Sequence, residues 1–304
     1  MSLTKSELQE FESGLNPAAI EQSIIPAEVI GYGEISTVFE IQGDNQNAYK
    51  RLPLFDNRKV AEDYAQIYDS YCKYLKQIGL NLPYDKTEII IHEQRPVVLY
   101  IIQKKHSPKR FAHKLTKSFN AQQFADLLKR ICIEIEKVWQ FNSENIPKKE
   151  LAIDGQLSNW ILTEDDKIYY IDTSTPLFKL DEVEQLNPDL ILKTAPSFLR
   201  WILRLFFLKD VMGRYYDNRQ VYMDLIANLY KEQRADLIPV AIKTINKYLK
   251  DDDKSIELEE VEKYYKEDKI IWTLFLAFRR FDRWLTTKIF RRQYEFILPG
   301  KIKR

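Results

Sequence analysis

Few cysteines and almost no net charge exclude several classes of protein. The chain has two cysteines among 304 residues, Cys72 and Cys132. Two are too few for a disulfide-rich scaffold or a four-cysteine zinc site. Both lie in helical patterns, which predicts buried free thiols. The 46 basic and 45 acidic residues give a net charge of +1, so we expect no nucleic-acid partner.

Long hydrophobic runs are also missing. The opening stretch, MSLTKSELQEFESG, is polar and has no apolar core of the signal-peptide type. The most apolar stretch, residues 198–208, is short and contains Arg200 and Arg204, which argues against a transmembrane segment. We therefore expect a cytoplasmic protein. Its length suffices for one large domain or two lobes.

Glycine is scarce too, with 8 residues in the chain, so the close pair Gly31 and Gly33 is unusual here. After a polar helical lead-in, the first hundred residues have the alternation and β-branched content of strands, interrupted by one helical pattern. The expected strands are residues 27–33, 36–43, 48–52, 88–93 and 97–103, with a turn over 42–47 and a helix over about 57–78. This order predicts a small sheet that carries one helix.

The pattern changes after about Lys104, where helical periodicity dominates. The expected helices are residues 120–141, 197–208, 220–232, 237–249 and 270–290, with a hairpin over 159–172 and a charged loop over 250–260. Strands followed by helices indicate an α+β fold. We predict a sheet lobe over residues 1–104 and a larger, mostly helical lobe over residues 105–304.

The glycine pair belongs to the stretch GYGEISTV, residues 31–38. Gly31, Gly33 and Val38 match the kinase glycine-loop pattern G-x-G-x-x-G-x-V, and Ser36 stands where the third glycine would be. A turn without side chains lets backbone N–H groups approach phosphate oxygens closely. An ordinary hairpin turn between two strands is the alternative interpretation.

Lys50 lies in the expected strand AYKRL, toward its end and twelve residues after Val38. In the kinase pattern a strand lysine contacts the nucleotide phosphates and pairs with a glutamate of the next helix. Glu62 is the nearest candidate for that partner, and Asp63 and Asp69 on the same helix stay open. The alternative is one more surface lysine.

Three further polar residues stand at suggestive spacings. Asp154 and Asn159 are five positions apart in IDGQLSN, as in the kinase catalytic loop, and Asp172 follows at the end of the apolar run IYYID. A carboxylate can take a proton from a hydroxyl group, and carboxylate and amide oxygens are ligands that Mg²⁺ accepts. Each residue alone is equally typical of a turn.

Taken together and in this order, these features resemble the protein-kinase-like superfamily. The stretches DGQLSNWIL and YYIDTSTP are closest in style to its aminoglycoside phosphotransferase and choline kinase branch. The resemblance covers about residues 25–175. It implies a bilobal fold with a small antiparallel-sheet lobe, binding of ATP and Mg²⁺, catalytic roles for Lys50 and Asp154, and metal binding by Asn159 and Asp172.

The same resemblance implies a nucleotide between the two lobes. Its phosphates would lie against the turn that contains Gly31, Gly33, Ser36 and Val38. Backbone groups of residues 103–105, which include Gln103 and Lys104, would meet the adenine edge. The apolar neighbours of the ring would be Ile30, Val38, Leu99 and Ile171.

Departures from the family pattern leave the activity open. Ala152 replaces the usual histidine, Ile153 an arginine or glycine, and Thr173 and Ser174 a phenylalanine and a glycine. Every group expected to touch metal, phosphate or the acceptor proton is nevertheless present. We therefore expect an ATP- and Mg²⁺-dependent phosphotransferase that acts on a hydroxyl group of a small molecule. The alternatives are a pseudokinase-type nucleotide-binding or scaffolding protein, and an enzyme that transfers a nucleotidyl group.

The C-terminal region, residues 279–304, is strongly basic. It holds nine basic residues and two acids, Asp282 and Glu295, with aromatic residues between them. Such a segment can meet an anionic membrane surface, nucleic acid or an acidic partner. The alternative, which we prefer, is an amphipathic helix whose aromatic face packs on the large lobe.

Overall fold

Apolar alternation in the first hundred residues produces a five-stranded antiparallel sheet in the computed structural model of the protein. The structure describes residues 2–33, 35–92, 95–193, 195–196, 199–206, 212–249 and 253–299. The strands are β1 (Ala27–Tyr32), β2 (Thr37–Ile41), β3 (Asp44–Phe55), β4 (Asp85–Ile90) and β5 (Val97–Lys104). Their order across the sheet is β1-β2-β3-β5-β4. An α+β fold is therefore confirmed.

The turn between β2 and β3 is shorter than the expected segment 42–47. Gly43 has φ +99°, a left-handed conformation that lets two residues reverse the chain. The carboxylate of Asp44 then accepts hydrogen bonds from the Gln46 N–H at 2.8 Å and from the Tyr49 hydroxyl at 2.6 Å. These polar residues satisfy one another inside the strand, so the sequence signal for a long turn was wrong.

Helix α2 (Arg58–Gln77) follows the prediction closely and connects the sheet to the rest of the molecule. Asn57 caps it by accepting a hydrogen bond from the Val60 N–H. Its buried stripe contacts two cores. Tyr64 and Tyr68 pack with the sheet, whereas Tyr71 packs with the helical part of the chain. The helix therefore presents tyrosines to the boundary between the two.

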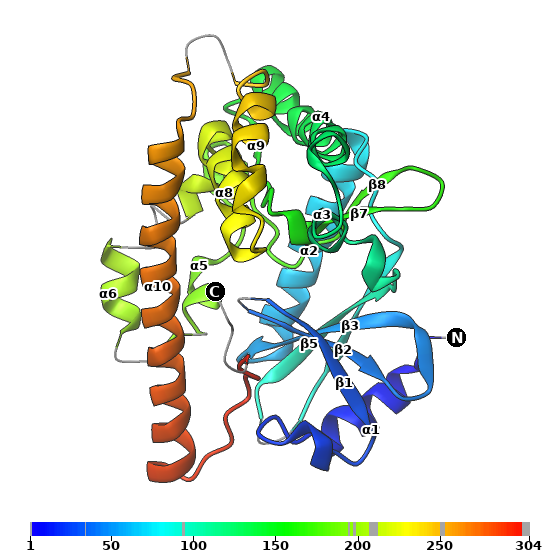
Figure 1. Cartoon of the computed structure of the whole chain (residues 1–304). Coiled ribbons are helices and arrows are strands. Elements are labelled where there is room, and N and C mark those ends of the chain that lie inside the picture. Colours follow the sequence, from blue (N-terminus) through cyan, green and yellow to red (C-terminus); the bar gives the residue numbers. More distant parts are fainter. Residues whose placement is uncertain are drawn as a thin grey trace.

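Most of the remaining elements lie beyond β5. Helix α1 (Lys5–Gly14) precedes the sheet. The other helices of five or more described residues, besides α2, are α3 (Ala112–Thr116), α4 (Ala121–Asn145), α5 (Pro188–Leu192), α6 (Arg200–Phe206), α8 (Asn218–Lys231), α9 (Ile238–Ile245), α10 (Leu258–Trp284) and the π-helix η5 (Leu285–Ile289). The short strands are β6 (Lys149–Leu151), β7 (Trp160–Leu162), β8 (Ile168–Tyr170), β9 (Phe178–Leu180) and β10 (Val183–Glu184). Figure 1 shows the sheet and α1 at one end, α4, α8 and α9 at the other, and α10 alongside both.

Most of the expected C-terminal helices are present with shifted ends. Helix α10 begins at Leu258, inside the segment expected as a charged loop, because Glu257 and Glu260 form a capping box there. Helix α6 covers only the middle of the expected helix 197–208, and residues 197, 198, 207 and 208 lie outside the described part. Cys72 and Cys132 are buried as expected. Within the described ranges, no helix is both long and apolar enough to cross a bilayer.

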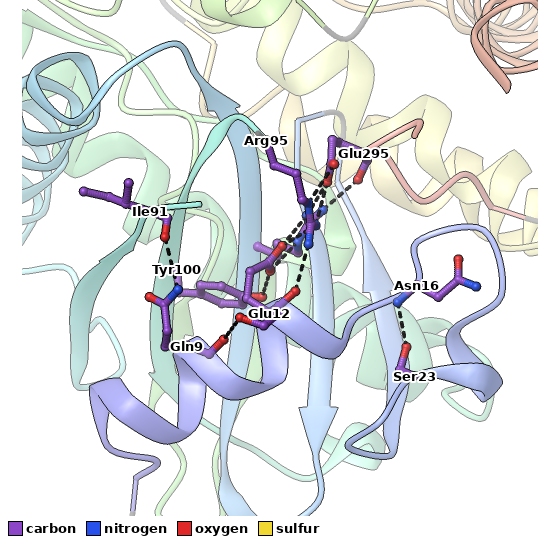
Figure 2. Close-up of polar contacts among 10 residues, drawn as sticks. Gln9, Glu12, Asn16, Ser23, Ile91, Arg95, Tyr100 and Glu295 are labelled. Carbon is purple, nitrogen blue, oxygen red and sulfur yellow. Dashed lines mark hydrogen bonds and ion pairs between the residues drawn. The ribbon is translucent and has the colours of Figure 1, made fainter. Parts of the chain in front are cut away.

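The chain after α10 returns to the sheet and is held there by buried charges. Glu12 of α1, fully buried, accepts hydrogen bonds from Arg51 of β3, and Glu295 accepts from the same guanidinium. Arg95 reaches both carboxylates, and Figure 2 shows it between Glu12 and Glu295. Burial alone would raise the pKa of Glu12, but the two guanidinium groups and Tyr100 hold it below its usual range.

Lys50 and Arg51 are consecutive in β3 and therefore point to opposite faces of the sheet. The Arg51 side chain lies on the face that α1 and the C-terminal segment cover, where Ile297 packs into the same apolar cluster as Phe11. The Lys50 side chain lies on the face toward α2. One strand thus joins the tethered C-terminus to the candidate site.

The preferred expectation for residues 279–304 was wrong in part. The segment around Tyr294 and Leu298 is buried against the sheet, but Phe281, Trp284 and Phe290 are 48%, 50% and 63% exposed. The aromatic face of the helix end is therefore turned to solvent and does not pack on the large lobe.

Candidate functional site

Lys50 and Asp172 meet across the boundary between the sheet and the helical part. The Lys50 Nζ donates to the Ile171 carbonyl at 2.7 Å and lies 3.6 Å from the Asp172 Oδ1. Lys50 is 7% exposed. Burial lowers the pKa of its ammonium group, and the carboxylate of Asp172 opposes that shift. The two residues form a charged pair that faces a cavity through Asp172, whose side chain is 33% exposed.

The loop that carries Asp154 begins at Ala152, where the family pattern has histidine. The Tyr71 hydroxyl donates to the Ala152 carbonyl at 2.8 Å. Asn142 of α4 forms two hydrogen bonds of 2.8 Å with the backbone of Leu151. Tyrosine and asparagine side chains therefore fix the backbone that a histidine would otherwise support.

Asp154 itself is fixed by its neighbours in the hairpin. Its N–H donates to the Tyr170 hydroxyl at 3.3 Å, and its Oδ1 accepts from the Gln156 N–H at 3.0 Å. The indole N–H of Trp160 donates to the Gly155 carbonyl at 3.1 Å. These contacts keep the loop rigid and orient the Asp154 carboxylate along the cavity wall.

Asn159 lies beside Asp172 because their strands pair. The Ile171 N–H donates to the Asn159 carbonyl at 2.9 Å, and the Asn159 amide N–H donates to the Asp154 carbonyl at 3.2 Å. All three candidate polar residues line the same cavity. The structure thus brings Asp154, Asn159 and Asp172 together, as the sequence spacing predicts.

The donor set fits Mg²⁺ better than a metal that needs a full protein cage. In the described ranges, no three His, Cys, Asp or Glu side chains converge on one point. Asn159 and Asp172 offer one amide and one carboxylate oxygen, and Mg²⁺ usually takes few protein ligands together with phosphate oxygens and waters. The pair could hold such an ion only with a phosphorylated ligand beside it.

The glycine turn reaches the same cavity through Tyr32, Gly33 and Ile35. The Gly33 N–H donates to the Ser36 carbonyl at 2.9 Å, and a Cβ at Gly33 would lie 2.7 Å from the Ser36 Oγ. Gly33 therefore lies close against Ser36, whose side chain would have to move to admit a Cβ. Gly31, Ser36 and Val38 do not line the cavity, so only part of the predicted loop faces it.

Glu62 does not meet Lys50, and that expectation was wrong. Glu62 pairs with Arg58 at 2.7 Å on the exposed side of α2, and Asp63 pairs with Lys59 in the same way. Among the described residues, the third candidate, Asp69, forms no ion pair with Lys50 either; Lys50 pairs with Asp172.

Tyrosines occupy the face of α2 where the glutamate was expected. The Tyr64 hydroxyl donates to the Ser174 carbonyl, and the Tyr68 hydroxyl lies 3.2 Å from the Thr173 Oγ1. With Tyr71 at Ala152, three residues of one helix hold both polar loops. The apolar periodicity of α2 marks them as buried, but nothing in the sequence assigns partners to their hydroxyl groups.

Gln103 and Lys104 also lie apart from the cavity. The Gln103 side chain is buried and donates to the Thr173 Oγ1 at 3.1 Å. The N–H groups of Lys104 and Lys105 donate to the carbonyls of Tyr84 and Gln46. Leu99, expected beside the adenine ring, is fully buried. The backbone expected to meet adenine is thus already hydrogen-bonded within the protein.

The cavity, of about 380 Å³, continues from Asp154 into the space between α8 and α10. The far wall of the cavity, formed by α8 and α10, carries charged side chains. Lys231 Nζ of α8 lies 3.2 Å from the Asp268 Oδ2 of α10, and the Tyr264 hydroxyl donates to the Asp224 Oδ1 at 3.3 Å. Burial raises the pKa of Asp224, although Lys231 opposes the shift. Sequence reasoning missed these residues because they match no motif.

Gln156 connects this wall to the candidate catalytic loop. Its side-chain carbonyl accepts from the Asn228 amide at 3.4 Å, and its side chain also hydrogen-bonds Asp224. A Cβ at Gly155 would lie 2.8 Å from the Val221 Cγ1. Glycine is required here because the loop packs directly on α8, which places the far wall next to Asp154.

Comparison with known proteins gives a family but no activity. The sequence matches no curated protein. A family model described as a family of unknown function, DUF6206, matches residues 20–283, which is most of the chain. The chain therefore belongs to the family of unknown function DUF6206.

Proposed function

We propose that the protein is an ATP- and Mg²⁺-dependent phosphotransferase with a bilobal protein-kinase-like fold, acting on a hydroxyl group of a small molecule. The observation that carries the proposal is the Lys50–Asp172 pair, 3.6 Å apart, in a site shared with Asp154 and Asn159. A strand lysine, two carboxylates and an amide supply the groups that phosphoryl transfer needs for positioning and charge neutralisation.

Each residue has one role in this proposal. The Lys50 ammonium group binds phosphate oxygens, since it lies beside Asp172 and below the glycine turn. Asn159 and Asp172 would hold Mg²⁺, which supplies positive charge to the phosphates when bound. The Asp154 carboxylate orients the acceptor hydroxyl and takes its proton.

The wall between α8 and α10 supplies the acceptor site in this proposal. Asp224, Lys231, Tyr264 and Asp268 present hydrogen-bonding groups of both kinds, and Trp272 adds an aromatic surface. A small ligand enters such a cavity, whereas a folded protein substrate would need an open groove. The cavity is continuous with Asp154, so an acceptor bound there can present its hydroxyl group to that carboxylate.

Two observations favour a second candidate, a nucleotide-binding or scaffolding protein without phosphotransfer. The N–H groups of Lys104 and Lys105 are used inside the protein, and Glu62 does not pair with Lys50. Both features differ from what a working kinase of this type would carry. A nucleotide-binding protein without phosphotransfer also gives a thermal shift, so the phosphotransfer assay separates the two candidates.

A thermal-shift titration with ATP, with and without Mg²⁺, tests nucleotide binding first. Ligand at a hundred times its dissociation constant adds about 2.7 kcal/mol to the free energy of unfolding. We expect a Mg²⁺-dependent shift that Asp172→Asn removes and that Asp181→Asn, an exposed control, retains. No shift at millimolar nucleotide would reject the proposal.

Phosphotransfer to candidate small-molecule acceptors tests the chemistry. The unmodified chain should transfer phosphate, and the Asp154→Ala and Asp172→Ala variants should not. Equal activity in all three would overturn the assigned roles. The product mass distinguishes transfer of the terminal phosphate from transfer of a nucleotidyl group.

A further inference from the structure

The second half of α10 exposes a row of large apolar side chains. The exposed fractions are 60% for Ile270, 52% for Leu274, 38% for Phe278, 48% for Phe281 and 50% for Trp284. Spacings of three and four residues put them on one side of the helix, over a length of about 21 Å. Ile289 and Phe290, 56% and 63% exposed, continue the apolar surface beyond the helix end.

The opposite side of α10 faces the protein. Val261 is fully buried, Tyr264, Asp268 and Phe275 line the cavity, and Arg279 is 4% exposed. These residues recur at the same helical spacing on the side away from Phe281. The helix therefore has an inner face that belongs to the candidate site and an outer face, which we call the α10 apolar row (Ile270, Leu274, Phe278, Phe281 and Trp284).

Basic side chains cluster at and beyond the C-terminal end of the α10 apolar row. The exposed ones are Arg280, Arg283, Lys288, Arg291 and Arg292. The acid within that segment is Asp282, which is partly buried and lies near Arg200 and Arg279. An apolar row with a basic margin is the arrangement of helices that lie in the headgroup region of anionic membranes. Figure 1 shows α10 along one side of the molecule, with α6 beside it.

We propose that the α10 apolar row and its basic margin bind an anionic membrane surface. The apolar side chains enter the boundary between headgroups and acyl chains, and the basic residues meet lipid phosphates and carboxylates. An anionic lipid surface suits the basic margin because lipid phosphates and carboxylates neutralise its exposed cations together. A second copy of the chain packed in parallel on the row would instead oppose like charges. This inference does not depend on the proposed phosphotransfer.

Vesicle co-sedimentation of the full chain tests the proposal. We expect binding to phosphatidylcholine vesicles that contain phosphatidylserine and little binding to vesicles of phosphatidylcholine alone. Each basic residue near the surface contributes roughly fivefold to the partition coefficient, so Arg283→Glu with Lys288→Glu should lower binding by more than tenfold. Phe281→Asp with Trp284→Asp should lower it comparably, because these side chains are the apolar anchor.

Matched controls separate the site from general charge and from misfolding. Lys73→Glu with Lys109→Glu changes the same net charge at exposed positions on another part of the surface and should leave binding unchanged. Circular dichroism should give the same helical signal at the assay temperature for each variant as for the unmodified chain, so that a loss of binding is not a loss of fold.

Three outcomes would overturn the proposal. They are no binding to either vesicle, equal binding to both, and binding that survives both double substitutions. A dimer in light scattering that dissociates in the Phe281→Asp variant would assign the row to a second copy instead.

Discussion

Replacing Tyr71 by phenylalanine tests whether α2 holds the Asp154 loop. The Tyr71 hydroxyl is buried and donates to the Ala152 carbonyl at 2.8 Å, and it also hydrogen-bonds the Tyr170 hydroxyl. Phenylalanine keeps the ring stacked on Phe178, at 6.3 Å between centroids. The substitution therefore removes hydrogen bonds without opening a cavity.

The cost of Tyr71→Phe follows from burial. A net hydrogen bond is worth about 1 kcal/mol, and a buried carbonyl left without a donor costs 1–3 kcal/mol. We expect the free energy of unfolding to fall by about 2 kcal/mol. We also expect weaker Mg²⁺-dependent stabilisation by ATP, because Tyr170 and the Ala152 backbone connect Tyr71 to Asp154.

Urea unfolding followed by tryptophan fluorescence measures the first effect, and thermal shift with Mg²⁺ and ATP measures the second. Tyr74→Phe is the matched control. Tyr74 lies one turn away on α2 and contacts the same Phe178 ring at 5.4 Å, and the described structure assigns its hydroxyl no hydrogen bond. If Tyr71→Phe and Tyr74→Phe gave the same unfolding midpoint and the same nucleotide shift, the positioning role of Tyr71 would be refuted.

Three further substitutions or conditions test the packing around the site. Gly155→Ala should destabilise the protein by about 1–3 kcal/mol in urea unfolding, since its new Cβ would lie 2.8 Å from the Val221 Cγ1. Glu295→Gln should cost about 1–3 kcal/mol, because Arg51 and Arg95 each lose one of their two carboxylate partners and keep the other, Glu12; limited proteolysis should then release the C-terminal segment first. The carboxyl groups of Glu12 and Glu295 have lowered pKa values despite burial, which by itself would raise them, because guanidinium groups surround them. Their stabilisation should be complete above the ordinary pKa of 4.5 and decrease as the pH falls below it, and urea midpoints across acid pH would show this.

The sequence predicted the grouping of the polar loop residues better than it predicted the partner of Lys50. Asp154, Asn159 and Asp172 lie together because their spacing reflects a loop and a hairpin, which are local structures. The Lys50–Asp172 contact was not predicted as a pair, since 122 positions separate the residues. The expectation for Glu62 was wrong because Glu62 lies on the exposed side of α2, whereas three tyrosines of the buried side hydrogen-bond groups that are distant in the sequence.

The helices show the same division between local and distant information. Periodicity predicted α2, α4 and the second half of α10 from their own residues. Periodicity does not say which apolar face is covered, so the aromatic residues near Phe281 were assigned to packing that the structure does not contain. The polar run Asp44–Asn47 predicted a turn from its residue types alone. In the structure its side chains bond Tyr49 and one another within β3, which the residue types do not reveal.

A crystal structure with Mn²⁺ and a non-hydrolysable ATP analogue tests the central claim most directly. Mn²⁺ replaces Mg²⁺ at oxygen sites and is located by its anomalous signal. We expect an anomalous peak for a metal ion that is bound by the Asn159 Oδ1 and the Asp172 carboxylate. Phosphate oxygens should complete its coordination, with Lys50 beside them. A metal bound elsewhere, or a nucleotide bound away from Lys50 and Asp172, would contradict it.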